Sequence, residues 1–279
     1  MLDTRLASPP DSDGPLPGRL PPLSSEVIPL KSVVAIPARL ASTRLPRKVL
    51  LDLGGKPVLQ HVWERTRRCK LAKAVVILAD SEEVASVARG FGAEVVMTDP
   101  ACPNGTYRLA SALDRLPGDF FVNVQGDEPF IEPALIDALA ARHAATGCPL
   151  VTAVSRLTSP GRLLADSVVK VVRAENGEAI YFSRSPVPHL RGVPVAEWTN
   201  RRAYWGHLGI YGYDRATLAR YPSLAATELE ACESLEQLRF VAHGFRFQTV
   251  ETDYHPVAID TPADLEHARS LVGNRGIEG

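Results

Sequence analysis

The chain has 279 residues, of which 45% are hydrophobic and 23% are charged, so it can bury a substantial core. Its 31 basic and 32 acidic side chains leave a formal charge of −1, which argues against a non-specific nucleic-acid binder. No apolar stretch has the length needed to span a bilayer, so no membrane partner is expected.

The N-terminal segment and the cysteines indicate a cytoplasmic protein. Residues 1–31 are rich in Pro, Ser and Gly, which predicts a disordered tail, and they lack the features of a secretory signal. The cysteines show no metal-binding spacing, so reduced thiols are the simplest interpretation. They are Cys69, Cys102, Cys148 and Cys232.

Short β-branched runs alternate with helical patterns up to residue 149. Strands are predicted at 33–36, 74–78, 94–97 and 120–124. Helices are predicted at 58–69, 81–91, 106–116 and 134–145. This alternation predicts a mainly parallel sheet that is covered by helices on both faces.

The pattern changes after Pro149. Partly antiparallel strands are predicted at 150–154, 167–172, 179–183 and 205–213, with helices at 215–221 and 231–243. Strands at 247–250 and 258–259 then return to the first sheet, and a helix capped by Thr261 and Asp264 closes the chain at 261–272. The domain prediction is a tail (1–31), a Rossmann-like region (32–149), a smaller lobe (150–250) and a returning segment (251–279).

A group of cations follows the first predicted strand. Arg39, Arg44, Arg47 and Lys48 lie within ten residues of one another. Ligands of α/β sheets bind at the carboxyl ends of the strands, where a loop can bring backbone N–H groups and positive charge to one point. The pattern predicts a phosphate site, although any one of these arginines alone would indicate only a solvated turn.

Two aspartates are candidate metal ligands. Asp127 directly follows the strand at 120–124, and Gly126 before it allows a close turn. A carboxylate in that position suits Mg²⁺, which takes one or two carboxylates together with phosphate oxygens and waters. Asp260 also follows an apolar segment, but Asp-Thr-Pro is an ordinary helix start, and from the residues alone the cap is favoured.

Several segments, in order along the chain, resemble the sugar-acid cytidylyltransferases of the CMP-Kdo synthetase type (Kdo is 3-deoxy-manno-octulosonate). They are PARLASTRLPRK with LGGKPVLQHV, NVQGDEP, YFSR, HLGIYGY, LEQLR and DTPADLE. The resemblance implies an α/β fold with a Rossmann-like, mainly parallel sheet of the nucleotide-diphospho-sugar transferase type and a smaller mixed α+β lobe. It also implies CMP transfer from CTP to a small acidic acceptor, release of pyrophosphate, and a homodimer formed through the lobe.

The resemblance assigns roles to individual residues. The catalytic residues would be Lys48, Arg39 and Asp127, and Mg²⁺ would be held by Asp127 and Asp260, which reverses the cap interpretation of Asp260. CTP would be bound by Ala38, Arg39, Arg44, Lys48, Asn104, Gly105, Thr106, Arg108 and Gln125. The acceptor would be bound by Arg184, His207, Tyr211, Glu236 and Gln237. Plainer alternatives stay open, because Asn104-Gly105 could be a tight turn, Tyr211 a core residue and Glu236 an exposed helical residue.

Four departures from the family pattern leave the acceptor open. The family usually has Arg or Lys at the position of Gly206 and an acidic residue at that of Tyr107. It usually has a threonine at the position of Ala79 and a small residue at that of Arg47. The acceptor could be Kdo, for lipopolysaccharide, or phosphonoformate, giving CMP-5′-phosphonoformate for phosphinothricin-type antibiotic biosynthesis. A GTP or UTP enzyme would carry more glycine in the opening loop. A catalytically inactive nucleotide-binding homologue would be expected to lose Lys48, Asp127 or Asp260, which are all present.

Overall fold

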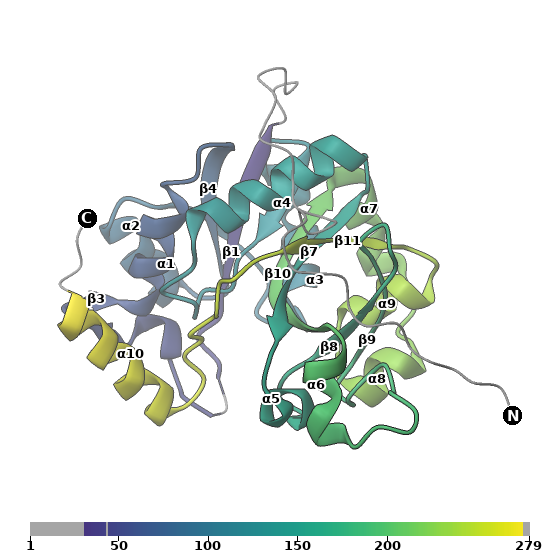
Figure 1. Ribbon diagram of the computed structural model, residues 1–279. Helices are drawn as coiled ribbons and strands as arrows, with labels where there is room; N and C mark the ends of the chain where they lie inside the picture. The colour runs from purple at the N-terminus through teal and green to yellow at the C-terminus, as the bar shows by residue number, and fades with distance from the viewer. Residues whose placement is uncertain (1–30, 43, 276–279) are drawn as a thin grey trace, which may run out of the picture.

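A computed structural model describes residues 31–42 and 44–275 (Figure 1). The predicted tail therefore lies, except for Lys31, outside the described residues. Nine strands form one sheet in the order β5-β4-β1-β6-β10-β7-β11-β9-β8. They are β1 (Ser32–Ala38), β4 (Ala72–Ala79), β5 (Glu94–Met97), β6 (Phe120–Asn123), β7 (Leu150–Leu157), β8 (Lys170–Arg173), β9 (Glu178–Ser183), β10 (Tyr204–Asp214) and β11 (Phe247–Glu251). A separate hairpin is formed by β2 (Asp52–Leu53) and β3 (Lys56–Pro57).

Ten α-helices accompany these strands in the described part of the chain. They are α1 (Val58–Thr66), α2 (Glu82–Gly90), α3 (Gly105–Ser111), α4 (Pro133–Thr146), α5 (Pro160–Leu164), α6 (Trp198–Arg201), α7 (Arg215–Arg220), α8 (Glu228–Glu233), α9 (Gln237–Ala242) and α10 (Pro262–Arg275). Across residues 31–42 and 44–275, none of the helices has the length and apolar character that crossing a bilayer requires.

The first half of the sheet is parallel, as the sequence predicts. β1 pairs in parallel with β4 on one side and with β6 on the other, and β4 pairs in parallel with β5. The chain therefore moves outward from β1 to β5 and then returns to the far side of β1 with β6. The switch point of the sheet lies between β1 and β6, where open α/β sheets bind their ligands.

The second half of the sheet is mixed. β10 runs antiparallel to both β6 and β7, and β11 runs parallel to β7. β8 and β9 pair with each other, and β8 also pairs with the start of β10, which closes these five strands on themselves. The division at residue 149 stays a prediction, because one sheet continues through it.

Both faces of the sheet are covered by helices. Along β1, Val34 and Ile36 belong to the core cluster beneath α1, α2 and α4, whereas Val33 and Ala35 belong to the cluster beneath α3, α7 and α9. Alternate side chains of a strand point to opposite faces, so burial on both faces requires an unbroken apolar run. α4 crosses one face of both halves of the sheet (Figure 1).

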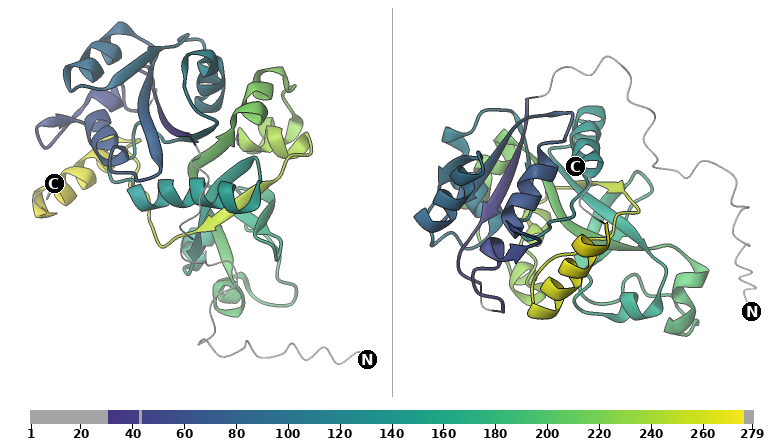
Figure 2. Two further views of the ribbon diagram at one scale, coloured as in Figure 1. Left: turned by 90° about the horizontal axis from the view of Figure 1, so that it is seen from above. Right: turned by 90° about the vertical axis from the view of Figure 1, so that its left-hand side faces the viewer.

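The C-terminal segment returns to the first half as a helix, and the predicted strand at 258–259 is wrong. α10 lies on the β2–β3 hairpin, far from β11 where the segment leaves the sheet (Figures 1 and 2). Leu265 and Ala268 of this helix are buried against Leu53 and Val58. The predicted cap is confirmed, because Asp264 Oδ2 accepts from Thr261 N at 2.8 Å and Thr261 Oγ1 accepts from Asp264 N at 3.2 Å.

Two predicted helices are interrupted. The helix predicted at 231–243 is two helices, α8 and α9, because Ser234 between them has the left-handed φ of 51°. That conformation ends an α-helix, and it is unusual for serine. The helix predicted at 106–116 begins one residue earlier, at Gly105, and ends in a separate 3₁₀ turn, η2 (Leu113–Arg115).

Gly212 is predicted to be essential for packing in β10. A Cβ atom there would lie 2.3 Å from Cζ of Phe120, whose ring is fully buried and stacked on His143 at 4.3 Å between centroids. Gly212→Ala should therefore destabilise the fold by about 1–3 kcal/mol in thermal denaturation. Gly209→Ala in the same strand is the control, since a Cβ there meets nothing within 4 Å. Equal effects of the two substitutions would contradict this account of the packing.

Candidate functional site

The site lies at the carboxyl ends of β1 and β6. The chain after β6 turns tightly against the end of β1, because Val124 N donates to Ala35 O at 3.0 Å. A Cβ atom on Gly126 would lie 2.9 Å from Pro37 O, so only glycine permits this approach. The turn places Asp127 beside the loop that follows β1.

Four charged residues from three distant segments meet there. Lys48, in the 3₁₀ turn η1 (Lys48–Leu50), donates from Nζ to Asp127 Oδ2 and, at 2.8 Å, to Asp260 Oδ1. Arg44 Nη2 lies 3.1 Å from Asp260 Oδ2. Burial disfavours the charged Lys48 ammonium, but the charge of Asp127 and hydrogen bonds to both aspartates outweigh this effect and raise the pKa of Lys48.

A backbone hydrogen bond fixes Asp260 beside Asp127. Ile259 N donates to Asp127 O at 2.9 Å, and Ile259 itself is fully buried against the β2–β3 hairpin region. Asp260 N then donates to Asp264 Oδ2 at 3.1 Å in the first turn of α10. Asp260 therefore lies at a helix start, as its local sequence predicts, and also reaches Lys48, as the resemblance implies.

The cationic loop is held by the turn between β4 and α2. Both carboxylate oxygens of Asp80 accept from Leu40 N, at 3.0 and 3.2 Å. Leu40 O in turn accepts from Arg47 N at 3.3 Å, and the Arg47 guanidinium forms an ion pair with Glu83. Arg47 has a left-handed φ of 58°. These contacts tie both ends of the loop to one turn.

Three further predicted CTP residues, Ala38, Arg39 and Gln125, lie at the carboxyl ends of β1 and β6. Ala38 is buried at the end of β1, and Arg39 directly after it is exposed. Gln125 Nε2 donates to Gly209 O at 3.3 Å, which connects the turn after β6 to β10.

The predicted CTP residues of α3 take part in contacts within the chain. Asn104 is the N-cap of α3, with Oδ1 accepting from Tyr107 N at 2.7 Å, so the proposed tight turn is a helix start. Thr106 is buried, with its hydroxyl 2.9 Å from the Tyr213 hydroxyl. Arg108 is buried and donates to Thr98 Oγ1 and to Asp99 O. Arg108 therefore braces the segment after β5.

Four of the five predicted acceptor residues form a second group. His207 and Tyr211 of β10 have ring centroids 5.3 Å apart, and the Tyr211 hydroxyl donates to Gln237 Oε1 at 3.1 Å. Thr152 Oγ1 donates its single hydrogen to Ile210 O at 2.8 Å. It therefore accepts the hydrogen bond from His207 Nε2, which lies 2.8 Å away. Burial lowers the pKa of His207 to about 3, so its ring is neutral near pH 7.

Glu236 completes this second group. Its carboxylate meets the hydroxyl and backbone N–H of Thr106, while Oε2 is buried with no hydrogen-bond partner among the described residues. Burial raises the pKa of Glu236 to about 7. A hollow of about 380 Å³ opens beside it, lined by residues of α8 and the α8–α9 junction that include Glu230 and Ser234.

Arg184 does not project a free guanidinium toward this group. Its Nε donates to Glu233 O at 2.7 Å, Nη1 to Asp166 O at 3.0 Å and Nη2 to Ser234 O at 3.4 Å. All three nitrogens therefore bind backbone carbonyls, and they hold the left-handed junction before Glu236.

The two groups lie on either side of the pairing between β6 and β10. Tyr211 is opposite Asn123, the last residue of β6, and the residues of β10 before Tyr211 extend beyond it. Glu128, next to Asp127, is buried, and burial and then the Asp127 charge raise its pKa to about 8. A protonated Glu128 adds no negative charge to the aspartate pair.

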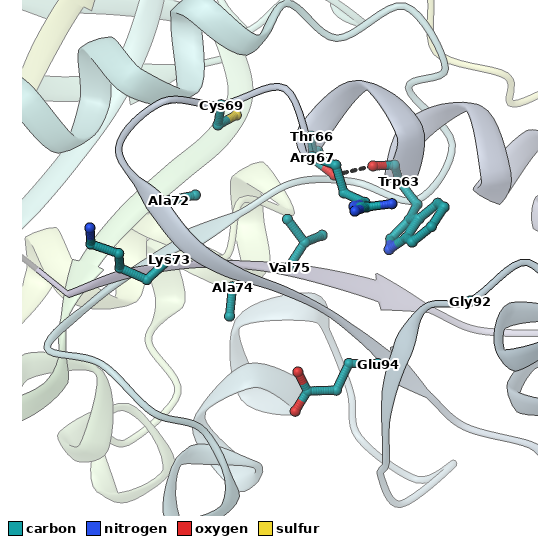
Figure 3. Close-up of a pocket in the computed structure, with 10 residues that line it drawn as sticks. All are labelled: Trp63, Thr66, Arg67, Cys69, Ala72, Lys73, Ala74, Val75, Gly92 and Glu94. Atoms are coloured by element: carbon teal, nitrogen blue, oxygen red, sulfur yellow. Dashed lines mark hydrogen bonds between the residues drawn. The ribbon is translucent and has the colours of Figure 1, made fainter.

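A pocket away from these groups, shown in Figure 3, lies at the opposite edge of the sheet. It is lined by the end of α1 and the first residues of β4 and β5. The Arg67 guanidinium lies 4.8 Å from the Trp63 ring centroid, and Thr66 Oγ1 donates to Trp63 O. The pocket lies at the amino ends of β4 and β5, whereas the charged cluster lies at the carboxyl ends of β1 and β6, so the pocket is not part of the candidate site.

Sequence reasoning missed Asp80 and Glu83. Asp80 directly follows β4, the strand beside β1, and Glu83 lies in the first turn of α2, so their place near the cationic loop was the available signal. Within residues 31–42 and 44–275, no group of three or more His, Cys, Asp or Glu side chains is arranged to hold a metal ion, and all four cysteines are free.

Comparison with known proteins identifies the family. The cytidylyltransferase family profile matches residues 33–249. A 3-deoxy-manno-octulosonate cytidylyltransferase of Geobacter metallireducens is 44% identical over 243 residues, covering 85% of this chain and 96% of its own. The enzyme of the same name from Myxococcus xanthus is 41% identical over 249 residues, covering 88% and 98%.

Solved structures agree with this assignment. A CMP:2-keto-3-deoxy-manno-octonic acid synthetase solved in complex with CTP superposes with a TM-score of 0.82 at 36% identity, covering 88% of this chain and 99% of its own. A 4-diphosphocytidyl-2C-methyl-D-erythritol synthase from Anaerococcus prevotii shares the fold alone, with a TM-score of 0.58 at 13% identity over 87% of this chain and 99% of its own. The predicted Rossmann-like α/β fold is thereby confirmed. The chain belongs to the cytidylyltransferase family and is a CTP-dependent nucleotidyltransferase.

Proposed function

We propose that the protein transfers CMP from CTP to Kdo, forming CMP-Kdo and pyrophosphate. The observation that carries the proposal is the contact of Lys48 with Asp127 and Asp260, at the sheet edge toward which the start of β10, with His207, extends. The relatives at 41–44% identity carry the name of the Kdo enzyme. The phosphonoformate alternative has no support from these relatives.

On the nucleotide side, Lys48, Arg44 and Arg39 would bind the triphosphate. Each follows β1 in the segment that Asp80 anchors through Leu40 N, so the backbone that carries them is held near the end of the strand. Ala38, Asn104, Gly105, Thr106, Arg108 and Gln125 would shape the cytidine pocket, several of them indirectly, by holding α3 and β10 in place.

Cytidylyltransferases of this kind generally use a divalent metal, and the chemistry of the donor set fits Mg²⁺. Asp127 and Asp260 offer two carboxylates beside the proposed phosphate site. Proteins usually bind Mg²⁺ with one or two carboxylates together with phosphate oxygens of the substrate. When bound there, Mg²⁺ would neutralise phosphate charge and lower the pKa of a coordinated hydroxyl.

On the acceptor side, neutral polar groups would recognise the sugar hydroxyls. His207, Tyr211 and Gln237 already form hydrogen bonds or ring contacts, and Glu236 and Gln237 each have a buried polar atom, Oε2 and Nε2, with no partner among the described residues. Such atoms suit hydrogen bonds with a polyhydroxylated ligand. Arg184 would act by holding the α8–α9 junction. The resemblance implies instead that Arg184 binds the acceptor's carboxylate directly.

The reaction would need no protein nucleophile. An acceptor oxygen attacks the α-phosphorus of CTP and pyrophosphate leaves, while the cations of the first loop stabilise the charge on the phosphates. A homodimer in the cytoplasm is part of the proposal. The resemblance places the dimer contact in the second half of the chain, where Leu164, Ile180 and Leu229 are exposed apolar side chains.

The proposed acceptor is tested by a pyrophosphate-release assay with CTP and Mg²⁺. Kdo should support turnover, whereas sialic acid and phosphonoformate should not. Turnover with phosphonoformate and none with Kdo would refute the proposed acceptor while leaving cytidylyl transfer intact.

Asp127→Asn should lower kcat by about a hundredfold or more, because the amide removes the charge that pairs with Lys48 and is proposed to hold the metal. Asp52→Asn, at an exposed position in β2, is the control and should keep normal turnover. Circular dichroism checks that both variants fold. Near-normal turnover of Asp127→Asn would remove Asp127 from the metal site.

Asp80→Ala should raise the KM for CTP roughly tenfold and leave the KM for Kdo almost unchanged, since it releases Leu40 and the loop that carries the cations. Asp80→Asn keeps one acceptor oxygen for Leu40 N–H and should recover most of the CTP affinity. An equal rise in both KM values would mean that Asp80 only stabilises the fold.

Glu236→Gln should stabilise the protein at high pH. The raised pKa of Glu236, about 7 against an ordinary value of 4.5, means that stability is lost as the pH rises from 4.5 through 7, when the buried group must ionise. The Tm of the variant should therefore equal that of the wild type at pH 4.5 and exceed it at pH 8. Each kcal/mol of added stability should raise the Tm by about 2–4 °C. Exposed Glu175→Gln should change neither value. A Tm difference independent of pH would contradict the buried, protonated carboxyl.

A further inference from the structure

The two proposed metal ligands are already engaged by cations of the chain itself. Lys48 bridges Asp127 and Asp260, and Arg44 takes the second oxygen of Asp260. The formal charges of these four side chains cancel. A divalent ion entering this cluster would have to displace the ammonium group from both carboxylates and remain close to two positive charges.

We propose that Lys48 and Arg44 block the aspartate pair against a free metal ion until CTP draws both cations onto its triphosphate. This inference rests on the proposed function, because it requires Asp127 and Asp260 to be the metal ligands. The triphosphate supplies several negative oxygens that pair with ammonium and guanidinium groups, and each cation that moves to phosphate frees a carboxylate. Nucleotide and metal then bind cooperatively, each raising the affinity for the other by the same factor.

The geometry allows the cations to move without refolding the site. The Lys48 side chain is mostly buried at 11% exposure, but the hydrogen bonds of its ammonium all go to the two carboxylates. Arg44 is 66% exposed and contacts only Asp260 among the described ion pairs. Asp127 and Asp260 are instead held through the backbone, by the bond from Ile259 N to Asp127 O and by the start of α10. The carboxylates should therefore stay in place while the cations leave.

The blocking role predicts an unusual gain of metal affinity when a proposed catalytic residue is removed. Mn²⁺ serves as the probe, because electron paramagnetic resonance measures its free concentration without any turnover. In the absence of nucleotide, Lys48→Met should bind one Mn²⁺ at least tenfold more tightly than the full-length wild type. Arg44→Gln, which frees only one oxygen of Asp260, should show a smaller gain.

Three matched variants locate the effect. Lys56→Met removes an ammonium that pairs with Glu64, away from the aspartates, and should leave Mn²⁺ binding unchanged. The double variant Lys48→Met with Asp127→Asn should lose the gained affinity. Lys48→Gln replaces Lys48→Met if the latter does not fold by circular dichroism.

Two results would overturn the proposal. In the first, the nucleotide-free wild type binds Mn²⁺ as tightly as Lys48→Met does, and Asp127→Asn loses this binding. That result would show that the metal reaches the aspartates although Lys48 is present. The other is equally weak Mn²⁺ binding by the wild type and all variants. Both are distinct from failure of the proposed function, which would appear as wild-type protein that releases no pyrophosphate from CTP with Kdo.

Discussion

The bridge from the Lys48 ammonium to Asp127 and Asp260 is the contact on which the site depends. It joins segments that lie 79 and 212 residues from Lys48 in the sequence. Partly buried charges are costly unless they are paired, so each member of the bridge makes the burial of the others acceptable. The site is therefore electrostatically balanced before any substrate binds, and charged substrates must exchange with charges that are already present.

The topology of the sheet makes this bridge possible. β1 and β6 are parallel neighbours, so the loop carrying Lys48 and the turn carrying Asp127 leave the sheet at the same edge. β10 runs antiparallel beside β6, with Tyr211 opposite the end of that strand. The first residues of β10, which include His207, consequently extend past β6 toward the same edge. One inserted antiparallel strand thus brings the start of the second group of polar residues to the sheet edge that carries the proposed nucleotide side.

Sequence patterns predicted what depends on local chemistry. The apolar runs that became β1 and β6 are buried on both faces, and such runs can be recognised without a structure. The left-handed Ser234 that separates α8 from α9 could not be predicted, because serine carries no preference for that conformation and tertiary contacts from Arg184 hold it. The convergence of Asp260 with Lys48 depends on a backbone bond from Ile259, which no side chain reveals. Only the family resemblance supplied it.

Three of the four departures from the family pattern have structural explanations that do not involve the acceptor, and nothing in the structure explains Tyr107. Arg47 turns its guanidinium to Glu83 and thereby ties the cationic loop to the β4–α2 turn. Gly206 lies where a Cβ would approach Leu157 Cδ2 at 2.8 Å, so its lack of a side chain serves the packing of β10 on β7. Ala79 is fully buried in the core beneath α1 and α2.

These positions therefore reflect local packing and loop attachment. The four departures were the reason to consider an acceptor smaller than Kdo, and that reason weakens because three of them have a structural cause. Among the residues that would meet the acceptor, His207, Tyr211 and Gln237 are connected by direct contacts. A phosphonoformate molecule, with no hydroxyl groups of a sugar, would leave the buried Glu236 Oε2 and Gln237 Nε2 without partners. The polar character of the second group thus favours a polyhydroxylated acid.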